Sequence, residues 1–285
     1  MRDQNGIKRQ MFHLILTACL AASSADCAPI LLPEGDAADR TACEAGAARI
    51  SDGWLARRPE LLGQGTTCTA SSDLPAATLE EIAPGVHVQL APAVQMEDSP
   101  DGRIANLGVV IGDRVAVIDA GVSRAEGQAL YVAIRRLTDR PIAHLVLTHL
   151  HPDHILGAEV FAEAGAEIVA HDAFAGALEV RGPIYLQNVQ RLYPAAEWIG
   201  TALPVVDRAV AGTERLDLGG RALLLTAHPP AHSESDLTAH DTATDTLFAG
   251  DLQFRDLAPV VDGSLSGWLG WMAAAPVPQP RLIVP

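Results

Sequence analysis

The sequence predicts an α/β fold, in which a layered domain of strands and helices follows a small cysteine-containing module. Apolar residues make up 48% of the 285-residue chain, which is enough for a sizeable core. After residue 80, short β-rich runs alternate with amphipathic helical segments, a pattern typical of helices that cover a sheet. The four cysteines all lie in the first 70 residues: Cys19, Cys27, Cys43 and Cys68.

The N-terminal stretch has two interpretations. Lys8 and Arg9 precede MFHLILTACLAASSA, which has the basic start, apolar stretch and small residues of a short signal peptide. The segment FHLILTACL can equally be a buried strand that opens the first folded unit. An even number of cysteines in a short segment predicts disulfides, with three possible connectivities, and so a periplasmic or otherwise exported protein. A zinc site is the less favoured use of these cysteines, since no C-x-x-C spacing occurs.

Composition also divides the chain and limits its partners. A stretch rich in small residues and proline follows residue 68, so we expect a module over 12–70, a linker over 71–79 and a second domain over 80–285. The net charge of -15 argues against nucleic acid or an anionic membrane as a partner, and says little about the small-molecule substrate that we expect. No segment reaches the roughly 20 apolar residues that a membrane span needs.

The second domain is predicted from its hydrophobic pattern. Two β-rich runs over 105–121 join at Gly112-Asp113, a hairpin signal, and a helix with apolar residues at helical spacing follows over 123–138. Pro152 is expected to lie in the first turn of another helix. We expect the remaining strands at 85–90, 141–149, 166–171, within 221–251 and at 281–285, and the remaining helices at 152–165, within 172–200 and at 264–275.

The segment THLHPDH (148–154) concentrates metal-ligand side chains in one turn. His149 and His151 are two residues apart at the end of a predicted strand, where they would share a face. Asp153 and His154 follow at the start of the next helix. Three of the ten histidines lie within residues 149–154, which argues against an ordinary surface loop. Imidazole and carboxylate are preferred zinc ligands, so the segment predicts a metal site.

This segment resembles the H-x-H-x-D-H signature of the metallo-β-lactamase fold superfamily. VAVIDAG (115–121) and TLFAGDLQF (246–254) are similar to two further strands of that family. The resemblance covers 80–285 and implies an αβ/βα sandwich with metals at one edge between two sheets. RIANLGVVIGD, TAHPPAHSESDLTAHD, PVVDGSLSGWL and the cysteine-bearing extension resemble more narrowly the zinc metallohydrolases of quinoprotein relay systems. That likeness implies a link to a periplasmic quinoprotein dehydrogenase system.

The resemblance implies two metal sites that share one carboxylate. His149 and His151 match the first site, and its third ligand is expected to be His232 in preference to His228, because the ligand follows a proline-containing turn shortly before a strand. The second site and the shared ligand match three more residues: Asp153, His154 and, as the bridge, Asp251.

Two further positions near this edge carry expectations. Asp119 matches a family aspartate, and we expect it to be a structural hydrogen-bond acceptor. In the family, a strand like RLIVP runs into a Gly-His-Gly turn whose histidine completes the second site. The sequence stops at Pro285, so by this comparison the C-terminus looks truncated and the second site lacks one ligand.

We therefore expect hydrolysis of an ester, thioester, amide or lactam by a water that one or two zinc ions activate, with Asp153 orienting that water or accepting its proton. One alternative is an iron enzyme similar to the mononuclear persulfide dioxygenases. Another is a catalytically impaired accessory or binding protein. No Ser-His-Asp arrangement is expected, because Ser71–Ser72 and Ser233–Ser235 lack a nucleophile-elbow pattern.

Overall fold

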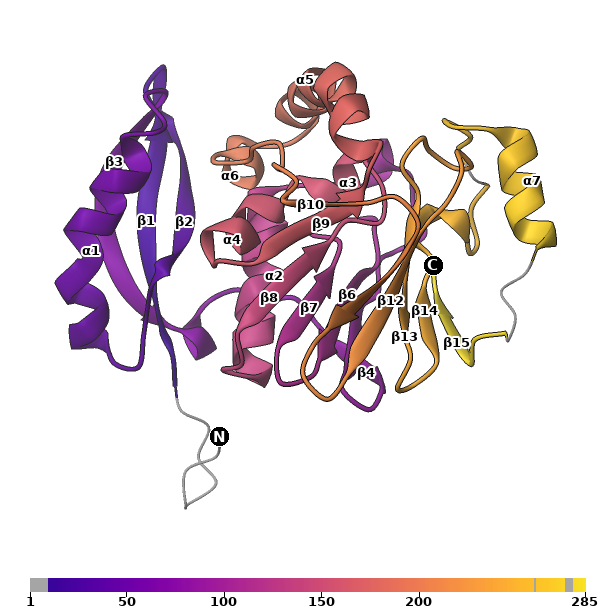
Figure 1. Ribbon diagram of the computed structural model, residues 1–285. Coiled ribbons are helices and arrows are strands. Elements are labelled where there is room, and N and C mark those ends of the chain that lie inside the picture. The colour runs from indigo at the N-terminus through magenta and orange to yellow at the C-terminus, as the bar shows by residue number, and fades with distance from the viewer. Residues whose placement is uncertain (1–9, 259, 275–278) are drawn as a thin grey trace.

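The computed structural model describes residues 10–258, 260–274 and 279–285. The chain forms a small N-terminal module beside a larger two-sheet sandwich (Figure 1). No helix among the described residues is long and apolar enough to cross a bilayer.

The N-terminal module is a three-stranded antiparallel sheet, in the order β2-β1-β3, with one helix against it. The apolar stretch near the N-terminus forms its central strand, as the second interpretation predicts. Disulfides join Cys19 to Cys27 across β1 and β2, and Cys43 in the helix to Cys68 in β3. The elements are β1 (Phe12–Leu20), β2 (Ser23–Ala37), α1 (Arg40–Leu55) and β3 (Leu61–Ala70).

A buried polar chain joins this module to the sandwich and corrects one expectation. The structure does contain a Ser-His-Asp arrangement: His13 contacts Asp36 through Nδ1 and Ser71 through Nε2, at 2.7 Å each. The Tyr131 hydroxyl donates to the other Asp36 oxygen at 2.7 Å. His13 is fully buried, Ser71 is nearly so, and the Ser71 hydroxyl also lies 3.1 Å from the carbonyl of Met11. The arrangement therefore connects four chain segments, and its serine is not exposed as a nucleophile. These contacts arise from pairing between distant segments, which the local sequence does not encode.

A second junction centres on Arg124, a fully buried arginine at the first residue of α2 (Arg124–Leu137). Its guanidinium pairs with Glu159 and Glu163 and donates to the Leu31 carbonyl at 2.9 Å. Trp54 of the module donates to Glu163 at 2.6 Å, and its ring lies 5.2 Å from the Arg124 guanidinium carbon. A buried charge needs partners of this kind, so the N-terminal module supplies part of the contacts that stabilise the Arg124 guanidinium.

The sandwich consists of a seven-stranded sheet and a five-stranded sheet, in the orders β10-β9-β8-β7-β6-β5-β4 and β11-β12-β13-β14-β15. One apolar core lies between the sheets, and a larger one lies between the seven-stranded sheet and the helices on its outer face. The strands are β4 (Glu80–Ala83), β5 (Val86–Gln89), β6 (Leu107–Ile111), β7 (Val115–Ile118), β8 (Ile142–Val146), β9 (Glu167–His171), β10 (Arg208–Val210), β11 (Thr213–Asp217), β12 (Ala222–Ala227), β13 (Leu237–Asp241), β14 (Thr246–Phe248) and β15 (Leu282–Val284).

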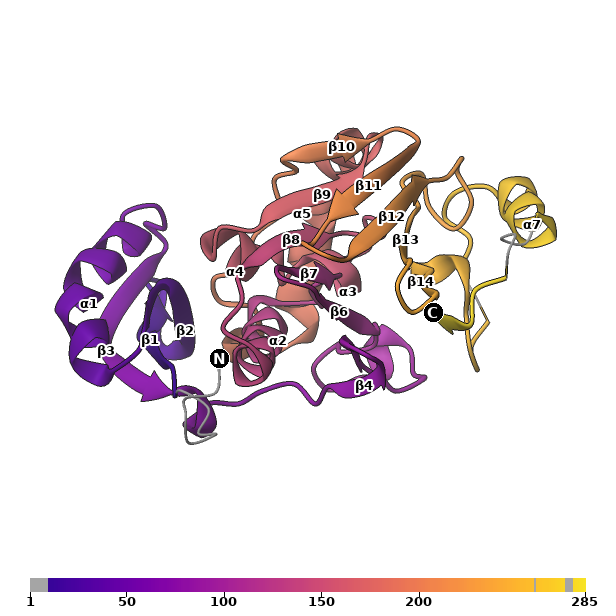
Figure 2. The same cartoon turned by 60° about the horizontal axis from the view of Figure 1, so that its bottom comes forward.

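Helices cover the seven-stranded sheet, and one further helix stands beside the five-stranded sheet (Figure 1). Besides α2 they are α3 (Pro152–Ile155), α4 (Ala158–Glu163), α5 (Phe174–Leu192), α6 (Ala195–Trp198) and α7 (Leu265–Ala273), with single 3-10 turns η1 (Ser71–Asp73), η2 (Met96–Asp98) and η3 (Gly250–Leu252). Figure 2 shows the segment 71–79 running from the module past α2 to β4, and Ala77 donates to the Ala129 carbonyl of α2 on the way.

Two predicted elements differ in extent from the structure. The strand predicted over 141–149 ends at Val146. There the backbone turns out of the ladder, and the Thr148 amide donates to the Asp119 carboxylate at 2.7 Å. The helix predicted over 152–165 is two short helices, α3 and α4, because the chain bends at Gly157, where the carbonyl of Ala120 leaves no room for a β-carbon.

Candidate metal centre

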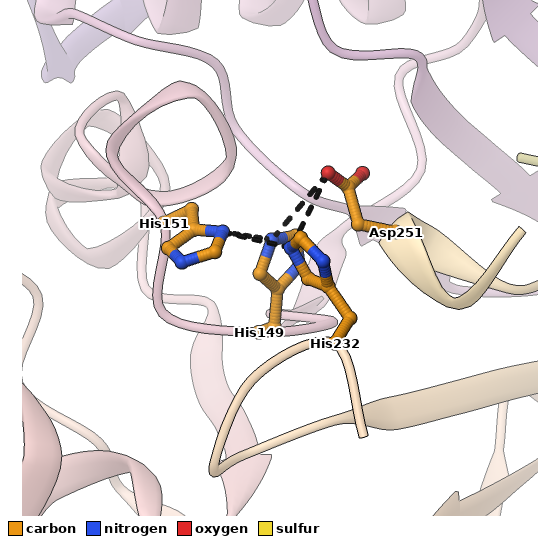
Figure 3. Close-up of side chains that lie close together, drawn as sticks. All are labelled: His149, His151, His232 and Asp251. Carbon is orange, nitrogen blue, oxygen red and sulfur yellow. Dashed lines mark hydrogen bonds and ion pairs between the residues drawn. The ribbon is translucent and has the colours of Figure 1, made fainter. Parts of the chain in front are cut away.

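Four side chains from three loops converge at one edge of the sandwich (Figure 3). The His151 Nδ1 atom lies 3.0 Å from His149 Nε2 and 2.9 Å from His232 Nε2. One Asp251 carboxylate oxygen lies 3.4 Å from His232 Nε2 and 4.0 Å from His149 Nε2. All four ligand atoms fall within 4.8 Å of one another. Ligands about 2.0–2.1 Å from a tetrahedral zinc ion would be about 3.3 Å apart, so the set fits such an ion.

The hydrogen-bond partners of His151 and His232 show which ring nitrogens carry hydrogen. The His151 Nε2 atom faces the Asp262 carboxylate at 3.0 Å, and the His232 Nδ1 atom faces the Val260 carbonyl at 2.9 Å. Both partners only accept, so each of these nitrogens carries its ring's hydrogen. The inner nitrogens of the two neutral rings are then lone pairs that face each other at 2.9 Å, with no proton to share. A cation between them removes that repulsion.

The fold delivers these residues for identifiable reasons. His149 and His151 follow β8, the central parallel strand that ends at this edge. The β12–β13 loop carries His232, and the buried Asp236 fixes it by accepting from the Ser233 hydroxyl at 2.7 Å and from the Ser233 amide. Asp251 lies in the 3-10 turn directly after β14.

Burial sets the charge state of the histidines. It lowers the pKa of His149 well below the usual value, and the neighbouring imidazoles lower it further. The pKa of His232 falls to about 4 because burial outweighs the attraction of Asp251. Burial also lowers the pKa of His151. Neutral imidazole is the form that binds metal, so these three rings are in that form at neutral pH.

A second group of side chains adjoins Asp251. His154 Nε2 lies 3.2 Å from an Asp251 oxygen and 3.4 Å from Asp153. Its Nδ1 contacts Asp119 at 2.8 Å. Burial opposes protonation, but the surrounding Asp153, Asp119 and Asp251 carboxylates raise the pKa of His154 well above its usual value. Asp153, His154 and Asp251 therefore converge on one point next to the first cluster.

Asp119 is a structural acceptor in this arrangement. Its carboxylate accepts from both the amide and the hydroxyl of Thr148, at 2.7 Å each, as well as contacting His154. Its φ of 61° lies in the left-handed region, where aspartate and asparagine are tolerated better than most residues. Asp119 thus sets the orientation of His154 from beneath the loop.

The structure separates the two candidate histidines of the β12–β13 loop. His232 points into the cluster, whereas His228 contacts the Thr238 hydroxyl at 2.9 Å and stays outside it. His171 packs against this loop, and its Nε2 contacts the His228 carbonyl at 3.0 Å. Asp262, the partner of His151, was not anticipated as a site residue. It lies within the segment PVVDGSLSGWL, but its pairing spans 111 residues and leaves no local pattern.

Comparison with known proteins identifies the family. Residues 100–285 match the model of the Metallo-beta-lactamase superfamily. The chain belongs to this superfamily. The match includes all the convergent residues described above, so the predicted sandwich and its αβ/βα assignment agree with the family.

Solved structures with the same fold include several superfamily members. A metallo-beta-lactamase from Pontibacter korlensis is 17% identical with a TM-score of 0.57, over 73% of this chain and 89% of that one. One from Hirschia baltica is 20% identical with a TM-score of 0.53, over 74% of this chain and 90% of that one. A double mutant of the sec-alkyl sulfatase PisA1 is 17% identical with a TM-score of 0.51, over 70% of this chain and 36% of that one. At these identities the superfamily likeness concerns the fold.

Among curated proteins, a linear primary-alkylsulfatase from Pseudomonas sp. (strain ATCC 19151) is 38% identical over 45 residues. This match covers 16% of the chain and spans only 8% of the length of that relative.

Proposed function

We propose that this chain is a zinc-dependent hydrolase that uses a metal-activated water on an ester, thioester, amide or lactam. The observation that carries the proposal is the 2.9 Å distance between His151 Nδ1 and His232 Nε2, two nitrogens whose rings carry their hydrogens on the outer side. A cation between these neutral nitrogens would remove their repulsion. Imidazole nitrogens with a carboxylate beside them are ligands that zinc prefers.

In this proposal His149, His151 and His232 hold one ion. Asp251 lies between this first site and the second site. Asp153 and His154 complete the second group with Asp251. Zinc, when bound, lowers the pKa of a coordinated water towards neutrality and polarises the attacked bond.

Asp153 is the residue we assign to proton handling. Burial would raise its pKa, but the neighbouring His154 and His151 hold the pKa of Asp153 below its usual value. The carboxylate is therefore ionised at neutral pH. An ionised carboxylate next to the attacking water can accept a hydrogen bond from it, fix its direction and take its proton.

The first test combines metal analysis with a matched pair of variants. We expect zinc in the purified protein, hydrolysis of chromogenic ester, thioester or lactam substrates, and loss of both in His232→Ala. His228→Ala is the control, because this histidine belongs to the same loop and contacts Thr238 instead. Iron content together with oxygen uptake would favour the persulfide-dioxygenase alternative. Zinc binding without hydrolysis of any substrate would favour the accessory or binding role.

Sulfate-ester hydrolysis is a second candidate, favoured by the 45-residue match to the alkylsulfatase. Release of inorganic sulfate from an alkyl sulfate, without hydrolysis of the carboxylic esters, would replace the first proposal with this one.

We further infer an exported, periplasmic location, because two disulfides in one small module are typical of an oxidising compartment. A quinoprotein dehydrogenase system as partner rests on the narrower resemblance of the sequence. Co-purification with such a dehydrogenase from the periplasm of the source cell would support it, and a cytosolic location with reduced cysteines would contradict it.

A further inference from the structure

One short segment, Val260–Ser264, touches the outer side of two candidate metal ligands. The amides of Asp262 and Gly263 both donate to the His232 carbonyl, at 3.0 and 2.8 Å, so the segment is fixed to the β12–β13 loop. The Val260 carbonyl accepts from the His232 ring at 2.9 Å. The segment thereby sets both the position and the tautomer of His232.

The same segment reaches the other loop through Asp262. The Asp262 carboxylate contacts His151 Nε2 at 3.0 Å, on the side of the ring opposite the cluster. An ionised carboxylate can only accept, so it holds the ring hydrogen on Nε2 and leaves Nδ1 unprotonated. It also fixes the direction in which that lone pair points.

Asp262 is itself held from a third direction. Arg181, on α5, pairs with the Asp262 carboxylate and also contacts Glu234 at 3.0 Å. The Asp262 side chain is 29% exposed, so without this partner it has room to turn towards water. Arg181 keeps it against His151 and connects α5 to a candidate metal ligand.

We propose that Asp262 is a positioning residue that sets the metal affinity of the cluster through His151, and that Arg181 acts through Asp262. The inference rests on the metal centre proposed above. A carboxylate on the outer nitrogen of a ligand histidine pre-orients the ring and makes its inner nitrogen more basic, and loss of such a partner typically weakens metal binding by about 10–100-fold.

The experiment measures zinc affinity directly, by competition with a chromogenic chelator, on the full chain. Asp262→Ala is expected to weaken zinc binding by about 10–100-fold. Asp262→Asn keeps an acceptor oxygen without the charge, so its affinity should lie between the two. Visible absorption of the cobalt-substituted protein gives a second readout, because a reoriented His151 ligand changes the cobalt spectrum, whereas a loss of stability that leaves the site intact does not.

A double-mutant cycle tests the role of Arg181. Arg181→Met should weaken zinc binding less than Asp262→Ala, and the double variant should match Asp262→Ala alone, because both act through one contact. Glu234→Gln is the matched control; it removes the charge of the other partner of Arg181 and should leave the zinc affinity unchanged.

The outcomes separate the two proposals. Failure of the unaltered chain to bind zinc or cobalt would overturn the metal centre itself. Normal zinc binding by that chain, together with an affinity within about twofold in folded Asp262→Ala, would overturn the positioning role and leave the metal centre standing. Additive losses in the cycle would overturn the route from Arg181 through Asp262.

Discussion

Replacing Asp119 by asparagine should disable His154 as a ligand while leaving the fold intact. Asparagine tolerates the left-handed backbone at this position, where φ is 61°. Its amide oxygen can still accept from the Thr148 amide. The amide nitrogen must then face His154 Nδ1, where the carboxylate lies at 2.8 Å in the unaltered protein. Because that nitrogen donates, the neutral ring, which is the form that binds metal, would carry its hydrogen on Nε2, the atom that faces Asp251 at 3.2 Å.

The contacts of Asp119 determine how much each substitution should lower the free energy of unfolding. Asp119→Asn keeps the side-chain volume and most contacts, so we expect the free energy of unfolding to fall by only about 1 kcal/mol. Asp119→Ala leaves the buried Thr148 amide without its acceptor, at about 1–3 kcal/mol, and forces alanine into the left-handed region, at about 1–2 kcal/mol. Loss of the remaining contacts to Thr148 and His154 brings the total to about 3–6 kcal/mol, a large part of an ordinary domain's stability.

The assay is metal titration monitored by calorimetry, together with urea unfolding. In Asp119→Asn we expect the second equivalent of zinc to bind about 10–100-fold more weakly, and the first to bind as before. Thr148→Val is the matched control for the second equivalent, because it removes a contact to the same carboxylate but leaves the Asp119–His154 pair. The first equivalent is not compared in this control, because the Thr148 hydroxyl also lies 3.1 Å from His149 Nδ1. Unchanged affinity for both equivalents in a folded Asp119→Asn protein would refute the tautomer argument.

Three further outcomes concern stability, each measured by urea unfolding. Arg124→Met should lower the free energy of unfolding by about 3–5 kcal/mol, because it breaks the buried ion pairs of Arg124 and leaves Glu159 and Glu163 to share Arg58, whereas Arg49→Met, in an exposed ion pair, should change it by less than about 1 kcal/mol; equal effects would contradict the buried junction. Replacing both Cys43 and Cys68 by serine opens a loop of sequence separation 25 and should cost about 3 kcal/mol, and an unchanged midpoint would contradict this. Burial, with a further contribution from a neighbouring histidine, lowers the pKa of His228 to about 4, so the unfolded chain binds the extra proton between pH 6.5 and 4. The contribution of His228 to the free energy of unfolding is complete above pH 6.5 and is lost as the pH falls towards 4. In the presence of a chelator, His228→Gln should reduce that loss by at most about 3 kcal/mol, and an unaltered dependence of the free energy of unfolding on pH would contradict the assignment.

The sequence was informative where chemistry is concentrated in one short segment. THLHPDH carries four of the expected ligands within seven positions, so the candidate metal centre and its place after a strand could be predicted locally. The preference for His232 over His228 came from family spacing, and the geometry agrees with it.

Pairings between distant segments were not predictable. His151 and Asp262 are 111 residues apart, and His13 and Ser71 are 58 residues apart. Their contacts depend on how complete elements pack, which hydrophobic periodicity does not specify. The short extent of β8 was missed for a related reason, because its end is set by the distant carboxylate of Asp119. Local apolar runs show where a strand lies, but hydrogen-bond acceptors far away in the sequence can determine where the strand ends.

The buried position of Arg124 makes the two parts of the chain mutually dependent. A version shortened to begin at residue 80 would lose the Leu31 carbonyl and the Trp54 ring, and Arg124 would keep its charge without them. That arginine opens α2, the helix directly after the turn that contains Asp119. Disorder at the arginine would thus begin five residues from the support of His154. The N-terminal module for this reason supports the edge of the sandwich that carries the candidate metal ligands, and its removal would destabilise that edge.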